Sequence, residues 1–289
     1  MIIIKLQGGL GNQIFQYAFG RALEEKSRLE IKFDKNYYYN DRSPKDTVRP
    51  YHLDKFNTKI SFANNEEIFT LNPPLKKFYI RVREAILNNF SKNNPYHYSD
   101  AELNPKDNSY LFGHWQNGKY FKNIDNSLRN ELTLKNPLSS ESQIILDKIN
   151  SSSNSVSIHI RRTDYISKSY NFNFFGICDL NYYKKAIELI KEKNPNPSFY
   201  IFSDDINWVK ENLNFIENPI FVSRKEIPDY EELIIMSKCN HNIIANSSFS
   251  WWAAWLNPNR EKVIIAPKKW LSNTKINTSD IIPSTWIKI

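Results

Sequence analysis

The pattern of apolar positions at the start of the chain changes from a continuous run to a helical spacing. Residues 1–6 are apolar except for Lys5, which predicts a buried strand. Apolar side chains then recur every three or four positions over 12–26, which predicts an amphipathic helix, and 29–33 predicts a second strand. This β-loop-α-β order is typical of doubly wound α/β folds.

A second alternation of strands and helices follows after about residue 155. Strand-like runs lie at 155–160, 198–203, 219–222, 241–245 and 262–267, separated by helix-like segments at 180–193, 205–213, 229–238 and 249–256. This repeated βα pattern predicts a parallel sheet with helices on both faces. Ligands of such sheets bind at the carboxyl ends of the strands.

Between these two regions the pattern is less regular. The stretch from about 36 to 136 is rich in Asn, Pro and Tyr, and its topology stays open apart from an amphipathic segment at 78–90. A helix is predicted at 139–149, and the Ser/Asn-rich run 151–155 is the best candidate for a boundary, because such composition bends easily. We therefore expect one domain at 1–150 and another at 151–289.

Length and composition agree with a folded protein of two α/β lobes. The 289 residues are 40% hydrophobic and 24% charged, and the two cysteines lack the spacing of a zinc site or a disulfide framework. No signal peptide or membrane-spanning run is visible, so we expect a cytoplasmic protein, either free or peripheral at the inner face of the membrane. The net charge of +8 does not decide among anionic partners.

Three of the seven glycines of the chain crowd into the turn between the first predicted strand and helix. Gly8, Gly9 and Gly11 would allow positive φ and close approach of the backbone, and the helix that follows offers free N–H groups to a diphosphate. The spacing GGLG differs from the dinucleotide fingerprint G-x-G-x-x-G. A tight turn without a ligand, capped by Asn12, is the alternative.

The strand at 155–160 ends in charged side chains, in the sequence SIHIRRTDY at 157–165. Successive side chains of an extended chain point to opposite sides, so one arginine could grip a phosphate while the other pairs with a carboxylate. A structural ion pair is the alternative. The candidate residues here are His159, Arg161, Arg162 and Asp164.

Two further motifs follow predicted strands. The carboxylates of FSDD, Asp204 and Asp205 after Ser203, could cap a helix, read the N–H edge of guanine or ligate a metal, but no second carboxylate cluster supports a magnesium site. In NSSFSWWAAWLN, hydroxyls at a helix start could hold phosphate, whereas we interpret the tryptophans as core. The candidates in this motif are Asn246, Ser247, Ser248 and Phe249.

Taken in order, these segments resemble the bacterial α-1,2-fucosyltransferases. The resemblance runs from GGLGNQIFQYAFGRAL through HIRRTDY and FSDD to IIANSSFSWWAAWL and IIAPKKW, with HWQNGKYF at 114–121 similar to an aromatic motif of that family. It covers the whole chain. It implies a GT-B-like architecture of two Rossmann-type lobes with a donor cleft between them, the acceptor bound by 1–150 and GDP-fucose by 151–289.

The resemblance also implies residue roles. Arg161 would contact the β-phosphate, His159 and Asp204 or Asp205 would lie toward guanosine, and Asp164 is a candidate base that its closeness to two arginines would weaken. The assignment of the base stays open. The other implied donor contacts are Arg162, Ser203, Asn246, Ser247, Ser248 and Phe249, joined from the first lobe by Gly9, Gly11 and Asn12.

The implied reaction is an inverting transfer of L-fucose from GDP-fucose to the 2-hydroxyl of a terminal galactose, for example in lipopolysaccharide. Arginines and helix N-termini would neutralise the leaving diphosphate, so neither a metal nor another cofactor is expected. An α-1,3 or α-1,6 linkage is one alternative. A non-catalytic carbohydrate- or nucleic-acid-binding protein is another, but nucleic acid is not expected because the basic residues are scattered.

Overall fold

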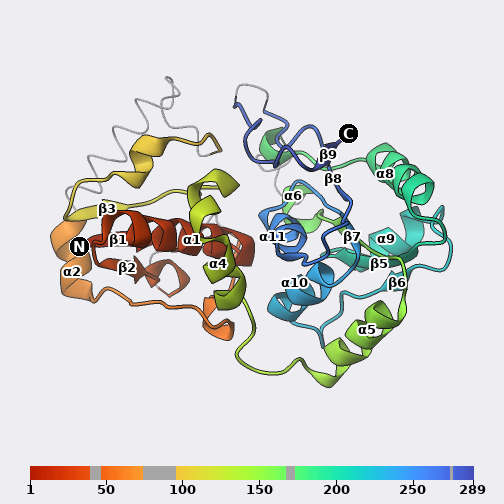
Figure 1. Cartoon of the computed structure of the whole chain (residues 1–289), viewed down its shortest axis with the longest axis horizontal. Coiled ribbons are helices and arrows are strands. Elements are labelled where there is room, and N and C mark those ends of the chain that lie inside the picture. Colours follow the sequence, from red (N-terminus) through yellow and green to blue (C-terminus); the bar gives the residue numbers. More distant parts are fainter. Residues whose placement is uncertain (40–46, 74–95, 167–172, 274–275) are drawn as a thin grey trace. The chain divides into compact units, whose positions relative to one another are not determined.

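The computed structural model describes residues 1–39, 47–73, 96–166, 173–273 and 276–289, which form two compact units. The first comprises Met1–Thr133 with Ser279–Ile281, and the second comprises Leu134–Thr278 with Ile282–Ile289. Each unit is built around its own parallel sheet (Figure 1). The predicted α/β class, a GT-B-like architecture of two Rossmann-type units, is confirmed.

The division between the units falls before the Ser/Asn-rich run that marked the predicted boundary. Helix α5 (Ser140–Ser151) is part of the second unit. Glu231 of helix α10 (Asp229–Ser237) fixes its start by accepting hydrogen bonds from the N–H and the hydroxyl of Ser139, at 3.2 and 2.6 Å. The run at 151–155 is therefore the turn from α5 into the second sheet.

The first sheet contains β1 (Ile2–Lys5), β2 (Ile31–Asp34) and β3 (Ser109–Leu111) in the order β2-β1-β3, all parallel. The chain leaves β1 through α1 (Leu10–Ser27) and enters β2 on one side of β1, and later it enters β3 on the other side. The direction of winding thus reverses between β1 and β3. We call this position the first switch point, since ligands of open α/β sheets bind at such reversals.

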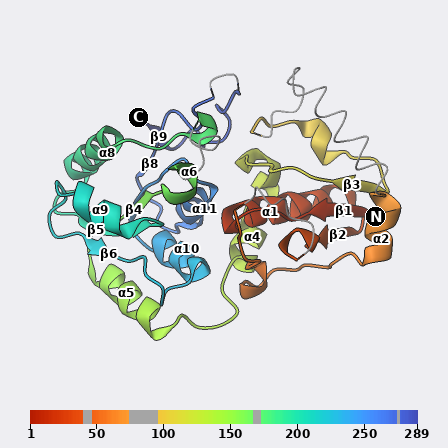
Figure 2. The same cartoon turned by 180° about the vertical axis from the view of Figure 1, so that it is seen from behind.

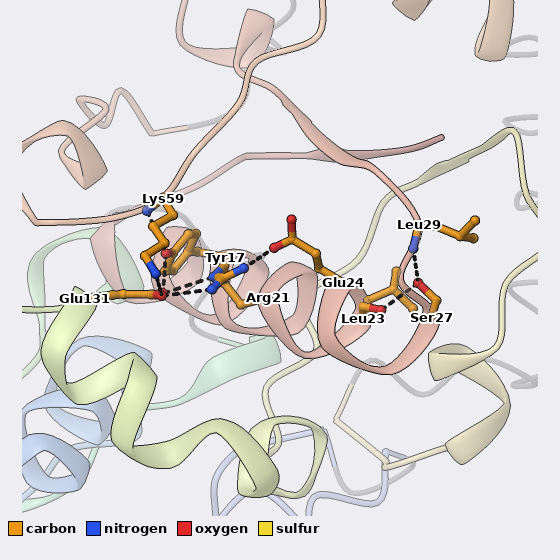
Figure 3. Close-up of polar contacts among 8 residues, drawn as sticks. All are labelled: Tyr17, Arg21, Leu23, Glu24, Ser27, Leu29, Lys59 and Glu131. Carbon is orange, nitrogen blue, oxygen red and sulfur yellow. Dashed lines mark hydrogen bonds and ion pairs between the residues drawn. The ribbon is translucent and has the colours of Figure 1, made fainter.

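Helix α1 packs in the first unit through apolar side chains and through a buried polar cluster of Tyr17, Arg21 and Glu131 (Figure 3). The Tyr17 hydroxyl donates to Glu131 Oε2 at 2.5 Å, and Arg21 donates to both carboxylate oxygens at 3.1 and 2.9 Å. Glu131 is the last residue of α4 (Asp125–Glu131). Although burial opposes it, the hydrogen bonds from Arg21 and Tyr17 hold the pKa of Glu131 below its usual value. The cluster fixes α1 and therefore the glycine turn before it.

The second sheet has six parallel strands in the order β6-β5-β4-β7-β8-β9. Their bounds are β4 (Ser155–Ile160), β5 (Ser198–Ser203), β6 (Ile220–Phe221), β7 (His241–Ile243), β8 (Ile264–Ala266) and β9 (Ile287–Lys288). The chain winds outward from β4 to β6 and then returns to β7 on the other side of β4. The second switch point therefore lies between β4 and β7.

Helices cover both faces of the second sheet (Figures 1 and 2). α8 (Leu180–Lys193) and α9 (Ile206–Asn212) pack on one face, where Ile158 meets Tyr183 and Val209 in a buried cluster. On the other face Asn242 donates to the Met236 carbonyl of α10 at 3.0 Å, and α10 packs on α11 (Ser248–Leu256). Trp251 and Trp252 of α11 are fully buried, so their predicted place in the core is confirmed.

The remaining described elements are short. In the first unit they are the 3-10 helices η1 (Asn36–Tyr38), η2 (Leu53–Lys55), η3 (Asp100–Leu103) and η4 (Gly118–Ile124) and helix α2 (Asn65–Leu71), and in the second α6 (Thr163–Ile166). The predicted amphipathic segment 78–90 lies outside the described residues. Within the described part, no helix has the length and apolarity needed to span a membrane.

Candidate active site

Three of the predicted motifs meet at the carboxyl edge of the second sheet. Arg161 follows β4, Asp204 follows β5, and Ser247 follows β7 and caps α11. β4 and β7 flank the second switch point, and β5 is the neighbour of β4. Parallel strands bring their carboxyl ends to one edge of a sheet, so motifs separated by more than 80 residues come together here.

Arg161 is held between two carboxylates. Its guanidinium lies 2.7 Å from Asp164 and 3.2 Å from Asp204, and its side chain is 17% exposed. Burial opposes its charge, but the two carboxylates outweigh this and raise the pKa of Arg161 above its usual value. The ion pair considered in the sequence analysis is thus present, and a ligand phosphate would have to compete with carboxylates for this arginine.

Asp204 organises the loop that follows β4. Its carboxylate accepts hydrogen bonds from the backbone N–H groups of Arg162 and Thr163 at 2.9 and 3.2 Å, in addition to its ion pair with Arg161. Because one carboxylate serves three donors, Asp204 joins the ends of β4 and β5 into a rigid corner. This use adds a structural role to the predicted contact with guanosine, which stays a prediction.

Arg162 and Asp205 form a second pair beside the first. The Nε of Arg162 lies 3.4 Å from Asp205, and its guanidinium carbon lies 3.9 Å from the centre of the Trp208 ring, close enough for a cation–π contact. Asp205 also caps α9 by accepting from the Trp208 N–H at 3.3 Å, while its own N–H donates to the Ser203 hydroxyl. Helix capping, the commonest use of such a residue, is therefore confirmed.

His159 near the end of β4 is 4% exposed, and among the described residues its Nδ1 has no hydrogen-bond partner. Its ring lies 5.6 Å from the ring of Phe249 at the start of α11. Burial and the neighbouring Arg161 charge lower the pKa of His159 to about 3, so the imidazole is neutral at physiological pH. A neutral ring can offer one donor and one acceptor to a ligand.

Asn246 and Ser247 use their side chains within the protein. Asn246 Nδ2 donates to the carbonyls of Phe175, Gly176 and Trp270 at 3.1 to 3.3 Å, which ties two loops to the end of β7. The Ser247 hydroxyl accepts from the Phe249 N–H at 3.3 Å as the N-cap of α11. These two residues therefore position the edge, and their predicted contact with the donor stays a prediction.

The sequence reasoning missed Glu232, a carboxyl near the same edge. It lies on α10, and burial, together with the charges of Asp229 and Asp204, raises the pKa of Glu232 to about 8. It is consequently protonated at neutral pH and able to donate a hydrogen bond. The only sequence signal was its place in the DYEEL run at 229–233, where solvent exposure was the simplest expectation.

The glycine turn of the first unit lies at the first switch point, directly after β1. Gly8 has φ of +80°, and a Cβ there would meet Asn12 Nδ2 at 2.7 Å, so a tight turn requires this glycine. Gly9 is different, because it has φ of −75° and the nearest atom to an added Cβ is Arg49 Cδ at 3.8 Å. The turn thus requires Gly8, whereas a methyl group at Gly9 would only make ordinary van der Waals contact with Arg49.

Amide side chains of α1 join the surrounding loops at this point. Gln13 Nε2 donates to the carbonyls of Gly8 and Pro50, and its oxygen accepts from the His52 N–H. Asn12 Oδ1 accepts from Gln116 Nε2 at 2.8 Å. Asn12 and Gln13 are therefore more than helix caps, since they bind together the segments that follow β1, β2 and β3.

Aromatic rings surround Lys35, just beyond the carboxyl end of β2. The Lys35 ammonium lies 4.1 Å from the ring centre of Phe62 and less than 6 Å from those of Tyr39 and Tyr51. Tyr39 is 64% exposed and Phe62 is 38% exposed. We call Lys35, Tyr39, Tyr51 and Phe62 the aromatic cluster. Exposed rings held beside a polar group offer both an apolar face and a hydrogen-bond donor to a ligand.

The described residues thus place an arginine and a serine-capped helix at the second switch point and aromatic rings beside the first, an arrangement compatible with an enzyme that handles a phosphate-bearing donor. The comparison with family models supports this class, since the model of Glycosyl transferase family 11 matches residues 1–289. The chain belongs to glycosyl transferase family 11.

Several characterised proteins are similar to the chain. An alpha-1,2-colitosyltransferase of Escherichia coli is 32% identical over 100% of this chain and 99% of its own length, and the O-antigen biosynthesis glycosyltransferase WbnK of Escherichia coli is 30% identical over 98% and 99%. Human galactoside alpha-(1,2)-fucosyltransferase 1 is 24% identical over 47% of this chain and 40% of its own. The crystal structure of fucosyltransferase NodZ from Bradyrhizobium aligns with 90% of this chain and 96% of its own chain. The sequence identity is 11% and the TM-score is 0.48.

Proposed function

We propose that the protein transfers L-fucose from GDP-fucose to the 2-hydroxyl of a terminal galactose, with inversion at the anomeric carbon. Membership in glycosyl transferase family 11 supports sugar transfer, and the similarity of 47% of the chain to a galactoside alpha-(1,2)-fucosyltransferase supports the sugar and the linkage. The observation that carries the proposal is the position of Arg161 at the second switch point, among the other motifs of the resemblance. An α-1,3 or α-1,6 product would refute the linkage alone.

On the donor side, the diphosphate of the proposed donor would bind Arg161, which already forms ion pairs with two carboxylates. Arg161 contacts two carboxylates, so a phosphate that binds it in bidentate fashion replaces at least one of these contacts. In the transition state negative charge grows on the leaving diphosphate, and this growth strengthens the contact with a fixed guanidinium. The α11 N-terminus and the neutral His159 complete the proposed donor site.

On the acceptor side, the first unit supplies the proposed sugar surface. The aromatic cluster offers ring faces that pack on the C–H face of a pyranose, and Lys35 offers a donor to its hydroxyls. Gly9, where a methyl group would fit in van der Waals contact with Arg49, lies at the turn after β1. This assignment keeps the acceptor with the first unit and the nucleotide with the second.

A second candidate donor is GDP-colitose. The relative that is 32% identical over the whole chain is an alpha-1,2-colitosyltransferase, and colitose differs from fucose in lacking the 3-hydroxyl. A site that hydrogen-bonds this hydroxyl would reject colitose strongly, whereas a merely apolar pocket would discriminate weakly. Direct competition between the two donors decides this point.

We further propose that the reaction needs no divalent metal and that the protein works in the cytoplasm or peripherally at the inner face of the membrane, on a lipopolysaccharide precursor. Among the described residues, no group of three or more His, Cys, Asp or Glu side chains is placed to hold a metal ion. The similarity to an O-antigen biosynthesis enzyme supports the pathway.

The test is an incubation of the purified protein with GDP-fucose or GDP-colitose and a panel of β-galactosides, with product linkage assigned by NMR. We expect an α-1,2-linked product from GDP-fucose, with or without EDTA. Transfer from GDP-colitose alone would make GDP-colitose the donor in place of GDP-fucose. Transfer from neither donor would refute the proposal. Loss of turnover in EDTA that magnesium restores would refute the metal-free mechanism.

A further inference from the structure

Tyr165 lies beside Arg161 at the carboxyl edge of the second sheet, and the mechanism proposed above does not use it. It belongs to α6, directly after Asp164, and the centre of its ring lies 5.8 Å from the guanidinium carbon of Arg161. This distance is within the range of about 6 Å over which an aromatic ring attracts a cation. Such a contact acts on the charge of the guanidinium and replaces none of its hydrogen bonds to oxygen.

Two further contacts fix the ring of Tyr165. Its hydroxyl donates to the backbone carbonyl of Asn246 at 3.0 Å, and its ring stacks on that of Phe175 at a centroid distance of 4.9 Å and an interplanar angle of 11°. Asn246 Nδ2 in turn donates to the Phe175 carbonyl at 3.1 Å. Three segments that are distant in the sequence therefore hold one another in a closed set of contacts around this ring.

The start of α6 is fixed separately, by Asp204. The N–H of Thr163 donates to the Asp204 carboxylate at 3.2 Å, and the Thr163 hydroxyl donates to the Asp204 carbonyl at 2.9 Å. A helix of four residues is too short to be stable by itself, so these contacts determine where Tyr165 lies. Since none of them involves Arg161, the ring is placed independently of the guanidinium that it contacts.

The adjacent Arg162 shows the same combination of a carboxylate and a ring. It pairs with Asp205 at 3.4 Å, and its guanidinium carbon lies 3.9 Å from the centre of the Trp208 ring. At either arginine a phosphate would compete with the carboxylate, because both anions bind the same N–H groups. A ring does not compete for these groups. The contact with Tyr165 is therefore the one that Arg161 can keep when an anion replaces its carboxylates.

We propose that Tyr165 is a positioning residue of the transfer reaction that acts through Arg161. When the diphosphate of the donor replaces a carboxylate, the ring keeps the guanidinium in the orientation that a bidentate contact with the β-phosphate requires. The same fixed orientation stabilises the negative charge that grows on the leaving diphosphate. The inference rests on the proposed function and concerns residues of the second unit alone.

The first experiment separates the β-phosphate from the rest of the nucleotide. GDP and GMP are titrated into full-length wild type, Tyr165→Leu and Tyr165→Phe by isothermal calorimetry, since GMP lacks the phosphate assigned to Arg161. We expect Tyr165→Leu, which loses the ring, to weaken GDP binding about fivefold or more. Tyr165→Phe keeps the ring but loses its anchor on Asn246, so its effect should be smaller. The GMP affinity of both variants should equal that of wild type.

The second experiment tests by kinetics whether Tyr165 acts through Arg161, using the donor that wild type accepts. In Tyr165→Leu, kcat should fall about tenfold or more while the acceptor KM stays unchanged. In the Arg161→Lys background, Tyr165→Leu should have little further effect, because the planar group that the ring orients is already absent. The matched control is Tyr182→Phe, which loses a buried hydroxyl bonded to the Ile244 carbonyl at 2.6 Å, directly after β7. It should lower the melting temperature but keep kcat.

The outcomes separate this inference from the proposed function. If wild type transfers sugar but Tyr165→Leu keeps its kcat, or loses affinity for GDP and GMP by the same factor, Tyr165 is not a positioning residue. If the effects of Tyr165→Leu and Arg161→Lys multiply, Tyr165 does not act through Arg161. If wild type transfers neither fucose nor colitose, the proposed function fails and this inference fails with it. Melting temperatures show whether the variants fold, and Tyr165→Phe carries the test if Tyr165→Leu does not.

Discussion

The two switch points share a plan but differ in chemistry. Each lies between parallel strands, each is followed by a helix N-terminus, and each holds a histidine whose Nδ1 has no partner among the described residues. At the second, Arg161 and Asp204 act on His159 through their charges, whereas the loop that carries His114 is anchored by the uncharged side chains of Gln16 and Gln116. The difference teaches that one strand topology can carry either an ionic edge or a neutral, amide-lined edge, depending on the side chains that follow its strands.

The most direct way to break this comparison is to change the charge geometry at the second switch point. Arg161→Lys keeps the positive charge but loses the planar fork, so we expect transfer to fall about 10²-fold or more if the contact with phosphate is bidentate. Steady-state kinetics with GDP-fucose would measure this. Near-normal activity would show that Arg161 serves only its ion pairs.

A structural role must be separated from a catalytic one in that variant. Arg161 is largely buried against Asp164 and Asp204, so its replacement could also destabilise the second unit. Arg224→Lys is the matched control, because Arg224 forms an exposed ion pair with Glu141 in the same unit. It should leave both the melting temperature and kcat unchanged.

Gly9 allows a test at the first switch point. Gly9→Ala adds a methyl group in ordinary van der Waals contact with Arg49, at a backbone conformation that alanine adopts readily. The loss of a favourable N-cap costs about 1 kcal/mol or less. If substrate approaches the backbone at Gly9, the methyl group lies in its way, and kcat/KM should fall while the melting temperature changes little. Gly8→Ala should instead lower the melting temperature, because alanine is strained at a positive φ and its Cβ would meet Asn12.

The aromatic cluster gives a smaller and more selective prediction. Tyr39 is mostly exposed, so Tyr39→Ala should leave stability intact while raising the acceptor KM several-fold and leaving the KM for GDP-fucose unchanged. Phe69→Ala is the matched control, since Phe69 is 62% exposed on α2 of the same unit and lies outside the cluster. Equal effects of the two variants would contradict the assignment of the acceptor surface.

Acid titration addresses the histidine that the second switch point contributes. The pKa of His159 is lowered to about 3, while that of an unfolded histidine is about 6.5, so between these values the unfolded state binds a proton that the native state does not. Stability should therefore fall as the pH drops from about 6.5 toward 3. His159→Gln should reduce this slope by about one proton in denaturant titrations at pH 7, 6 and 5. An unchanged slope would show that His159 is protonated in the native state.

The sequence predicted the second unit well and the first only in part. Alternation of polar and apolar residues identified β4, an apolar run identified β5, and the spacing of apolar residues identified α8, each to the residue. In the first unit β2 begins at Ile31 rather than at residue 29. Arg28 ends α1 in a left-handed conformation, and nothing in the sequence predicts this conformation for an arginine. β3 is three residues long and partly exposed, so no periodicity marked it.

The candidate site shows where such reasoning stops. Clusters of unusual residues at strand ends located Arg161, Asp204 and Gly9, because chemistry and position coincide there. Tyr165 and Glu232 were missed, since a tyrosine after a charged motif and an acidic helix start are common on surfaces. Their significance comes from burial and from neighbours that are distant in the sequence, such as Asn246 for Tyr165.

The pairing of Arg161 also bears on which anions this chain can retain. A formal charge of +8 attracts phosphate, nucleic acid and nucleotides alike. At Arg161 an incoming anion must displace carboxylates at 2.7 and 3.2 Å, and a small ion gains too few other contacts to offset that loss. A nucleoside diphosphate gains contacts along its whole length. If the donor is the proposed GDP-sugar, we therefore expect GDP to inhibit transfer at concentrations at which millimolar orthophosphate does not.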